Sequence, residues 1–271
     1  MKRSCFAALF SLCLAVLVTC AVGQTDGASA VTNRPFNYGE TLTYDGKAKV
    51  SSLLPATSVA DLTFTVAKAP DSNNYVITGN AKSKGTLVKM FSYSFLENYE
   101  STIDSAEFKA LKSTHHDVQK ERVRDGLATF DYGQKRVTYV ETDPGDPMRP
   151  PRNIASNLEG VTHDIVSGLY SIRLRPLELN KTFEVTISDS GLVYKVPVRV
   201  TAREQQKTIF GRIWCWRIEP DVFGPGRIID REGKMIIWVA DDARRIPVRA
   251  TIDTFVKIDI RLKSASNLKQ T

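Results

Sequence analysis

The chain has 271 residues, of which 42% are hydrophobic and 25% are charged. This composition excludes a disordered chain, a collagen-like chain and a membrane protein with many spans, and the length allows a sizeable core. The formal net charge is +7, but the basic residues are spread along the chain rather than clustered with aromatic residues, so we expect no nucleic-acid partner.

The first segment of the chain has the features of a secretory signal. Lys2 and Arg3 precede the uncharged apolar run 6–18, which is too short to span a membrane comfortably but fits the hydrophobic part of a signal peptide. We predict a signal peptide over residues 1–23, with cleavage after Ala30 as the alternative site and an uncleaved anchor as the alternative outcome. After cleavage we expect no transmembrane span.

The cysteines lie mostly within this signal segment. Cys5, Cys13 and Cys20 leave with it and only Cys215 remains, so the mature chain has no internal disulfide and depends on its core. Cys215 lies in an apolar stretch between two tryptophans, which favours a buried small hydrophobic residue over a nucleophile. Residues 17–20 resemble the lipidation signal of lipoproteins, so a lipid anchor at Cys20 is an alternative.

The rest of the chain is dominated by short segments in which apolar and polar residues alternate. Their β-branched and aromatic residues predict strands, and turns rich in Gly, Pro, Asn and Asp separate them. The predicted strands cover residues 41–50, 61–66, 75–81, 91–99, 127–132, 136–141, 182–187, 192–202, 208–218, 234–239, 246–252 and 255–262.

One central segment differs from this pattern. Residues 143–151 are rich in Asp, Pro and Arg, and we interpret them as a linker. Apolar residues at helical spacing follow in 162–173, where we predict one helix of about three turns. Thr162 is the expected N-cap, while Asp164 and Arg173 suit the two ends of the helix dipole.

These patterns predict a mainly β fold with a single curved antiparallel sheet, as an open or partial β-barrel or a clam-like meander. We expect the short central helix to pack against this sheet. A lone helix and half a meander would each leave an apolar face uncovered, so we predict one β-rich domain over residues 31–265. Residues 266–271 are expected to form a flexible tail.

The residue types used in catalysis and metal binding do not form a recognisable site. His115 and His116 are adjacent, so in a strand they point to opposite faces and cannot bind one metal ion. His163 and Ser167 share a helix face, but no nucleophile-elbow motif accompanies them. The pair Asp241–Asp242 precedes two arginines, which favours a turn with local ion pairs over paired catalytic carboxylates. We therefore expect no metal, no cofactor and no enzymatic activity.

Aromatic residues of the predicted strands are the candidates for a ligand-binding face. Trp214 and Trp216 lie two residues apart and share one strand face. Such indoles can bind sugar rings or line a lipid cavity, and packing in the core is the alternative. The candidate residues of this face are Phe91, Phe95, Trp214, Trp216 and Trp238.

Three motifs, in this order along the chain, together resemble one protein family. Residues 36–44 contain a Gly-Glu pair followed by Leu-x-Tyr, residues 162–173 contain Asp-x-x-Ser-x-x-Tyr-x-x-Arg, and residues 237–248 contain Trp-x-x-Asp-Asp-x-x-Arg-x-Pro. On these motifs the chain resembles the bacterial exported family called domain of unknown function 3108, over residues 36–262. The resemblance implies a β protein of the periplasm or of the periplasmic face of the outer membrane. It implies no reaction, because the function of the family is not established.

The polar residues of these motifs are the candidates for a structural network. A buried arginine–carboxylate network that ties the helix to the sheet would explain them without any ligand. The candidate members are Glu40, Tyr44, Asp164, Arg173, Asp241, Asp242 and Arg245.

Three functions fit these observations. The first is a non-enzymatic cell-envelope protein that binds or carries a lipid-like or other hydrophobic ligand in the concave face of its sheet. The second is a structural or scaffolding partner in an envelope protein assembly, which would use edge strands or apolar patches. The third, for which the sequence offers least, is a hydrolase that acts on envelope polymers.

Overall fold

The computed structural model describes residues 34–49, 55–85, 88 and 94–270, which all belong to one unit of the chain. The predicted signal peptide and the candidate ligand residue Phe91 lie outside these residues. No helix in the described ranges is both long enough and apolar enough to cross a membrane.

The described residues form fourteen strands and the helix α2 (Ile165–Ile172). The strands before the helix are β1 (Thr41–Lys49), β2 (Thr57–Lys68), β3 (Tyr75–Ser83), β4 (Phe95–Ile103), β5 (Ala110–Gln119), β6 (Arg122–Asp131), β7 (Arg136–Thr142) and β8 (Arg152–Asn157). The strands after it are β9 (Thr182–Asp189), β10 (Leu192–Thr208), β11 (Gly211–Pro220), β12 (Lys234–Ala240), β13 (Pro247–Asp253) and β14 (Lys257–Ser266).

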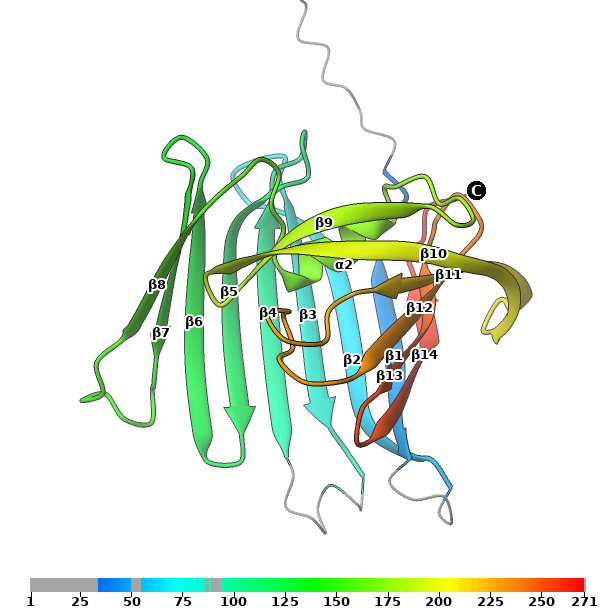
Figure 1. Ribbon diagram of the computed structural model, residues 1–271, viewed down its shortest axis with the longest axis horizontal. Coiled ribbons are helices and arrows are strands. Elements are labelled where there is room, and N and C mark those ends of the chain that lie inside the picture. Colours follow the sequence, from blue (N-terminus) through cyan, green and yellow to red (C-terminus); the bar gives the residue numbers. More distant parts are fainter. Residues whose placement is uncertain (1–33, 50–54, 86–87, 89–93, 271) are drawn as a thin grey trace, which may run out of the picture. The chain divides into compact units, whose positions relative to one another are not determined.

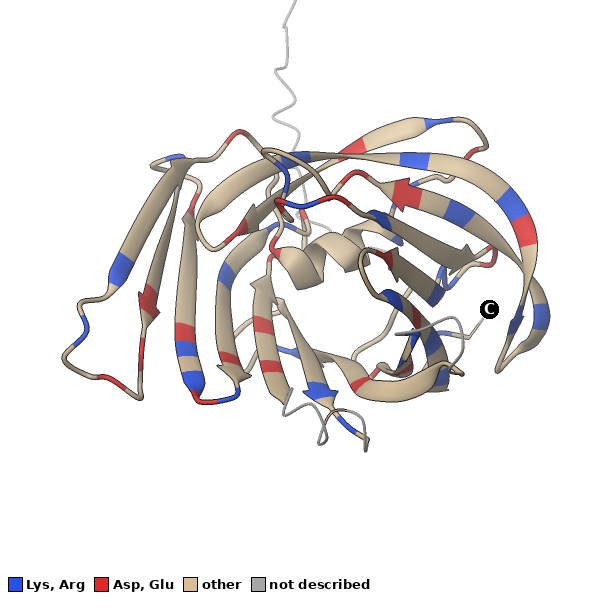
Figure 2. Ribbon diagram, turned by 60° about the horizontal axis from the view of Figure 1, so that its bottom comes forward, with Lys and Arg blue, Asp and Glu red and all other residues tan. Residues whose placement is uncertain are grey.

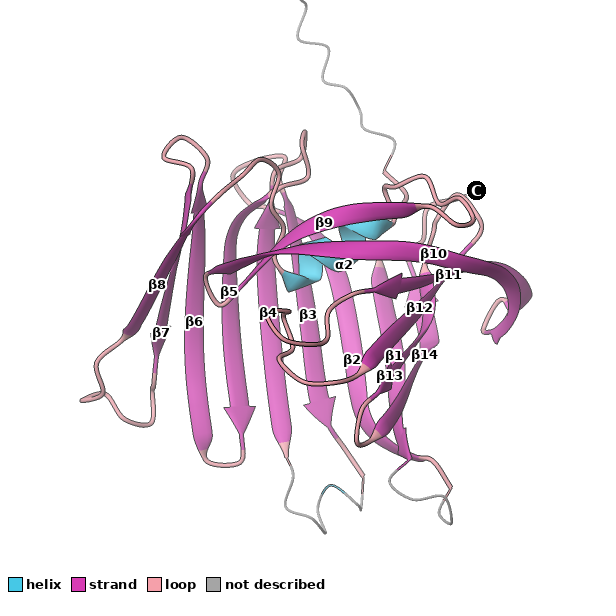
Figure 3. Ribbon diagram, viewed as in Figure 1, coloured by secondary structure: helices cyan, strands magenta, loops and turns pink. Residues whose placement is uncertain are grey.

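All these strands belong to one antiparallel sheet with the order β8-β7-β6-β5-β4-β3-β2-β1-β14-β13-β12-β11-β10-β9. The chain therefore runs as one meander from β1 to β8, crosses through α2, and returns as a second meander from β9 to β14, which pairs with β1. The sheet is not closed, because β8 and β9 end the order. It curls so that β9 and β10 pass in front of α2 (Figures 1 and 3). This arrangement confirms the predicted fold class.

The helix lies between two apolar clusters and joins the two meanders. Val166 and Tyr170 pack with Ile77 and Ile103 of the first meander. Ile172 packs with apolar residues of β9–β12, which belong to the second meander. Because the helix has apolar residues on both sides, both meanders of the curved sheet pack against it. Side chains of the helix and of the sheet therefore fill much of the concave face.

Asp164, and not Thr162, is the N-cap of α2. Asp164 Oδ1 accepts a hydrogen bond from the backbone N–H of Ser167 at 2.8 Å, and Ser167 Oγ accepts one from the backbone N–H of Asp164 at 2.9 Å. His163, just before the cap, forms two backbone hydrogen bonds with β9. The predicted cap at Thr162 is wrong because pairing with β9 keeps the chain extended up to Asp164.

Two strands, β5 and β8, were not predicted. The residues of β5 that face the helix are polar, among them Ser113, His115 and Asp117, so the strand shows no apolar alternation. Most residues of β8 are exposed, and the segment 143–151, interpreted as a linker, forms the loop between β7 and β8. Both strands lack the apolar face on which the prediction depended.

The end of the chain is attached to the rest of the unit, where a flexible tail was predicted. Leu268 packs against the cluster that contains Leu42 and Leu262. Asn267 donates a side-chain hydrogen bond to the Gly39 carbonyl at 2.9 Å, and Lys269 Nζ donates one to the carbonyl of residue 34 at 2.7 Å. These contacts hold residues 267–269 beside the start of β1.

Charged residues of both signs are interspersed along the strands (Figure 2). The ion pairs Lys84–Asp45, Arg203–Asp241 and Arg249–Asp259 are examples that join neighbouring or nearby strands. The net positive charge of the chain is therefore distributed and not concentrated on one element.

Candidate functional site

A buried ion pair links the C-terminal end of α2 to Glu40, the residue before β1, and both partners belong to the predicted structural network. Arg173, the C-cap of α2, donates from Nη1 to Glu40 Oε1 at 2.5 Å and from Nη2 to Glu40 Oε2 at 2.9 Å. The Arg173 side chain is 1% exposed and that of Glu40 is 0% exposed. The guanidinium also donates to the carbonyls of Pro35 and Arg244, and it lies over the ring of Phe36. The hydrogen bonding of both charged groups is thus nearly complete, which a buried pair needs.

Among the other predicted members of this network, Tyr44 lies near the pair. The electrostatic effects of Arg173 and Glu40 both reach its hydroxyl, which donates to the Pro247 carbonyl at 2.8 Å. Burial is the largest effect and raises the pKa of this hydroxyl well above its usual value. Tyr44 therefore connects β1 to β13 beside the ion pair.

The remaining predicted members lie elsewhere, which corrects the prediction that all seven form one network. Asp164 serves as the N-cap of α2. Asp242 forms a turn with local ion pairs, as predicted, because it accepts bonds from the backbone N–H groups of Arg244 and Arg245 and from the Arg244 side chain. Asp241 binds Arg203 Nε at 2.6 Å. The Arg245 guanidinium donates to a backbone carbonyl just after α2.

The predicted aromatic residues do not share one face. Trp216 is paired with Val239, so Trp238, the neighbour of Val239 in β12, points to the opposite face of the sheet. Trp238 is buried and donates from Nε1 to Glu204 at 2.5 Å, while Trp216 donates from Nε1 to Asp241 at 2.7 Å.

The other two described members of the aromatic set are also separate. Trp214 is 46% exposed and lies under the Arg203 guanidinium. Phe95 lies far along the sheet, at the start of β4, in the other meander. The four described residues of the set predicted as one ligand-binding face are thus distributed over different parts of the structure.

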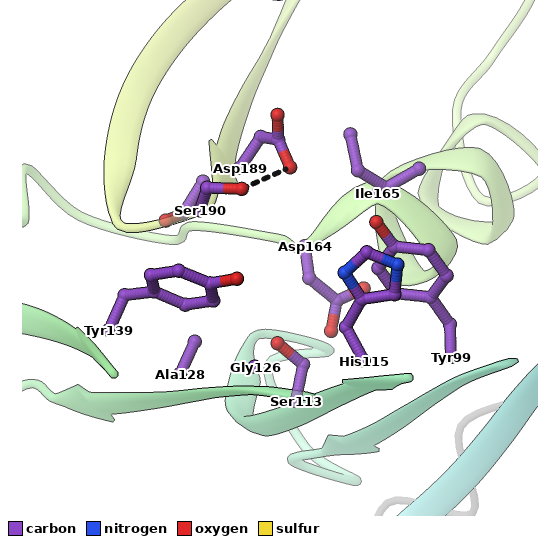
Figure 4. A pocket seen from close by; sticks show the side chains of 11 residues that line it. Tyr99, Ser113, His115, Gly126, Ala128, Tyr139, Asp164, Ile165, Asp189 and Ser190 are labelled. Atoms are coloured by element: carbon purple, nitrogen blue, oxygen red, sulfur yellow. Dashed lines mark hydrogen bonds between the residues drawn. The ribbon is translucent and has the colours of Figure 1, made fainter. Parts of the chain in front are cut away.

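A small polar cavity lies at the N-terminal end of α2, between β4–β7 and the turn from β9 to β10 (Figure 4). The rings of Tyr99 and His115 stack there, with centroids 4.1 Å apart and planes inclined by 12°. Tyr139 extends toward the cavity from β7, and Asp164 approaches it from the helix. The lining residues are Tyr99, Ser113, His115, Gly126, Ala128, Tyr139, Asp164, Ile165, Ser188, Asp189 and Ser190.

The electrostatics of this cavity follow from its burial. Burial raises the pKa of Asp164, and hydrogen bonds from Ser167 offset part of the rise. The nearby Ser101 hydroxyl also lowers this pKa, although it forms no direct hydrogen bond with the carboxylate. Burial likewise raises the pKa of Asp189 and lowers that of His115, so the low-dielectric surroundings disfavour charge on all three groups.

Sequence reasoning missed this cavity because its residues come from separate strands. His115 was correctly predicted to point away from His116, whose Nδ1 instead contacts Asp125 Oδ1 at 2.5 Å on the other face. The only sequence signal of the cavity was the unusually polar face of β5. Its partner residues, such as Tyr139 and Asp189, join it only through the curvature of the sheet.

Two wider grooves lie along β3–β6. Gly79 faces α2, because a Cβ on Gly79 would lie 3.2 Å from Val166 Cγ2. Residues of β3 at even positions, such as Asn80 and Lys82, therefore face away from the helix. One groove has a volume of about 440 Å³ and is lined mostly by polar residues, among them Asn80, Asn98 and His116.

The second groove lies at the ends of β3 and β4 and has a volume of about 500 Å³. Most of the surface that lines it is apolar, although two lysines and two serines are among its lining residues. Of the four described residues of the predicted aromatic set, only Phe95 borders it. Leu96 is paired with Lys82 on one side and with Val118 on the other, so Leu96 and Val118 also lie on the face away from α2. We call it the rim groove; its lining residues are Lys82, Ser83, Lys84, Gly85, Val88, Ser94, Phe95, Leu96 and Val118.

The groups that the sequence offered for catalysis have structural roles. Ser167 belongs to the capping box of α2, and burial raises the pKa of the Cys215 thiol to about 12, which disfavours the reactive thiolate. Cys215 is fully buried, as predicted. Over the part of the chain that the structure describes, no group of three or more His, Cys, Asp or Glu side chains is placed to hold a metal ion.

His163 gives the fold a specific pH dependence. Burial, with a smaller effect of Arg175, lowers its pKa from 6.5 to about 4. A depressed histidine pKa contributes stability that is present above pH 6.5 and is lost as the pH falls toward 4. For these two values the loss between pH 7 and pH 5 is about 2 kcal/mol.

Urea unfolding of the wild type and of His163→Gln at both pH values measures this contribution. We expect the variant to lose about 2 kcal/mol less than the wild type between pH 7 and pH 5. The comparison is needed because the raised pKa values of Glu97, Asp164 and Asp189 act in the opposite direction. His116→Gln is the control and should keep the wild-type difference; equal pH dependence of His163→Gln and wild type would contradict the assignment.

Comparisons with known proteins identify a family, and one solved structure agrees with the fold. The profile of DUF3108, described as a protein of unknown function, matches residues 41–263. A solved β-barrel-like protein of the domain of unknown function DUF1849 from Brucella abortus has a TM-score of 0.55 and 10% identity, covering 86% of this chain and 98% of that chain. A Bacteroides fragilis protein with a YmcC-like fold has a TM-score of 0.32 and 11% identity, with the same coverages. A comparison with the curated proteins gives no match.

Proposed function

The chain belongs to the DUF3108 family, whose function is unknown, and we propose that it is a non-enzymatic, exported protein of the bacterial cell envelope that binds a lipid-like or other hydrophobic ligand. The observation that carries this proposal is the rim groove. Its volume of about 500 Å³ lies within the range of about 300–1,000 Å³ that is usual for ligand sites. Its mainly apolar lining suits an alkyl chain.

The charges beside the rim groove favour an amphiphile with an anionic head group. Lys82 is exposed at the groove, while Lys84 is already paired with Asp45 and Asp61. An ammonium group that keeps its hydration at the edge of an apolar groove can attract a carboxylate or a phosphate. A hydrophobic ligand was also predicted from the sequence, but in the concave face of the sheet. The proposed site differs, because α2 and the apolar clusters occupy much of that face.

The cellular location is part of the same proposal. The predicted signal peptide supports export, and the family resemblance supports the periplasm or the periplasmic face of the outer membrane. A lipid-binding protein in that compartment would meet its ligand in either membrane leaflet that faces the periplasm.

Leu96→Asp is the variant that tests the rim groove. It places a carboxylate beside the alkyl chain and removes apolar contact, so we expect oleate to bind at least about tenfold more weakly than to the wild type. Isothermal titration calorimetry with oleate measures the affinities. Leu127→Asp is the matched control. Leu127 is in β6, lies on the same face of the sheet as Leu96 but outside the groove, and is 39% exposed. Equal oleate affinities of the wild type and both variants, or equal losses in both variants, would contradict the proposed site.

A scaffolding function is the second candidate, and the edge strand β8 favours it. β8 ends the strand order, so its outer backbone groups are open to another strand, and most of its side chains are exposed. Such an edge can accept a strand from a partner protein. Crosslinking from Arg152 in the native envelope would capture that partner, whereas crosslinks confined to other surfaces would exclude the β8 edge.

A further inference from the structure

The polar cavity at the start of α2 has an unusual set of atoms without partners. His115 Nε2, Asp164 Oδ2 and Ser188 Oγ are each buried and have no hydrogen-bond partner. Asp164 is 3% exposed and Ser188 is 4% exposed, and both line the cavity. Unpartnered buried polar atoms are costly, so three of them around one space favour the binding of a polar group between them.

The size of the cavity limits that occupant. Its volume is about 20 Å³, which is enough for one group of the size of a water molecule. The stacked rings of Tyr99 and His115 and the ring of Tyr139 form its walls (Figure 4). Only a single compact group can therefore contact all three unpartnered atoms.

The hydrogen-bonding character of the lining points to a donor. The Asp164 carboxylate accepts, and the Ser188 hydroxyl can accept as well as donate. The lowered pKa of His115 keeps its imidazole neutral at pH 7, so Nε2 accepts in the tautomer that has its proton on Nδ1. The three atoms together match a group with three donors.

The charge of the lining points to a cation. Two carboxyl groups, Asp164 and Asp189, line the cavity, while no Lys or Arg is among its lining residues. The positive end of the helix dipole disfavours a cation here, but the Asp164 carboxylate lies directly on that end and opposes its effect. A cation in the cavity would balance the negative charge of the two buried carboxylates. Without a cation, burial favours their protonated, neutral forms.

We propose that this cavity binds the primary ammonium group of a small organic amine, whose carbon atoms lie outside this space, on the side where the cavity is open to solvent. An alkylammonium head is compact, carries one positive charge and has three N–H donors, as the ε-ammonium of lysine does. The aromatic faces of Tyr99 and Tyr139 add favourable contacts for a cation. A water molecule has only two donors and leaves the carboxylates uncompensated. The amine site is independent of the rim groove, which lies on the other face of the sheet.

Methylammonium chloride is the probe, and the His115 ring resonance in an NMR titration is the readout. The chain has only three histidines, so each ring signal can be assigned by substitution. We expect a saturable shift of the His115 signal and an increase in melting temperature with methylammonium. Equal concentrations of sodium chloride or tetramethylammonium chloride should give neither, because sodium has no N–H donors and tetramethylammonium is too large and has none.

Variants locate the binding. Asp189→Asn removes one carboxylate and should weaken methylammonium binding about tenfold, and Ser188→Ala, which removes one acceptor, should weaken it several-fold. Glu232→Gln is the control, because it removes the same charge at an exposed position and should keep the wild-type affinity. No saturable shift, an equal shift with sodium or tetramethylammonium, or equal weakening in Glu232→Gln would overturn the proposal.

Discussion

Replacing Arg173 with Met is expected to lower the free energy of unfolding by about 3–5 kcal/mol, because it leaves the carboxylate of Glu40 buried without its partner. Glu40 is completely buried, and the Arg173 guanidinium binds both of its oxygens. The substitution also removes donors from the carbonyls of Pro35 and Arg244. The loss affects the junction of α2 with β1, which holds the two meanders together.

Urea unfolding at pH 7 measures this effect, and two further variants separate its causes. Arg199→Met removes an arginine whose side chain is 63% exposed and whose carboxylate partner is 3.8 Å away, so we expect a loss of less than about 1 kcal/mol. The double variant Arg173→Met with Glu40→Gln has no buried charge left and should recover part of the lost stability. Equal stability of Arg173→Met and wild type would show that the ion pair does not hold α2.

Replacing Gly191 with Ala is expected to lower the free energy of unfolding by about 3 kcal/mol. Gly191 has a φ of +80° in the turn from β9 to β10, a conformation that costs a non-glycine residue about 1–2 kcal/mol. A Cβ there would also lie 2.6 Å from Tyr139 Cβ and 3.1 Å from Ile154 Cβ. These neighbours are close to the backbone and cannot move aside cheaply, so overpacking adds about 1–3 kcal/mol.

Gly211 provides the matched control for this prediction. It has a φ of +87° in the next hairpin turn, and a Cβ on it would have nothing within 4 Å. Gly211→Ala should therefore cost only the backbone contribution, about 1 kcal/mol. Thermal and urea unfolding of both variants measure the loss in free energy of unfolding that each substitution causes. The difference between the two losses reports the contact of the β9–β10 turn with β7. Equal costs in the two variants would mean that this contact is absent.

Most of the sheet could be predicted because its strands bury one face. In β1, for example, Leu42 and Tyr44 are buried and alternate with less buried residues, so period-two alternation revealed the strand. The central helix was predicted from the spacing of Ile165, Leu169 and Ile172. Its start was misplaced by two residues, because pairing of His163 with β9 is a tertiary contact that local sequence does not report.

The strand β5 and the polar cavity were missed for a common physical reason. The residues of β5 that face the helix, including Ser113 and His115, line a polar space and not the apolar core. A strand of this kind has polar residues on both faces and gives no alternation signal. The Glu40–Arg173 pair could be predicted only through the family motifs, since the two residues are 133 positions apart in the sequence.

The prediction of a single aromatic face failed because of sheet register. Trp216 and Trp238 lie on adjacent strands, but their pairing offset places them on opposite faces. Their indole N–H groups bind Asp241 and Glu204, so both residues stabilise the β10–β12 region. Register between strands depends on turns and bulges that composition alone does not determine.

Native mass spectrometry of the mature chain, purified from the envelope of an expressing bacterium, tests the central claim most directly. If the protein binds a lipid-like ligand, part of the population will carry extra mass that is released on denaturation and identified as an apolar molecule. Leu96→Asp should lack this species and Leu127→Asp should keep it. A mass of the unliganded chain alone, unchanged after incubation with a total envelope lipid extract, would contradict the claim.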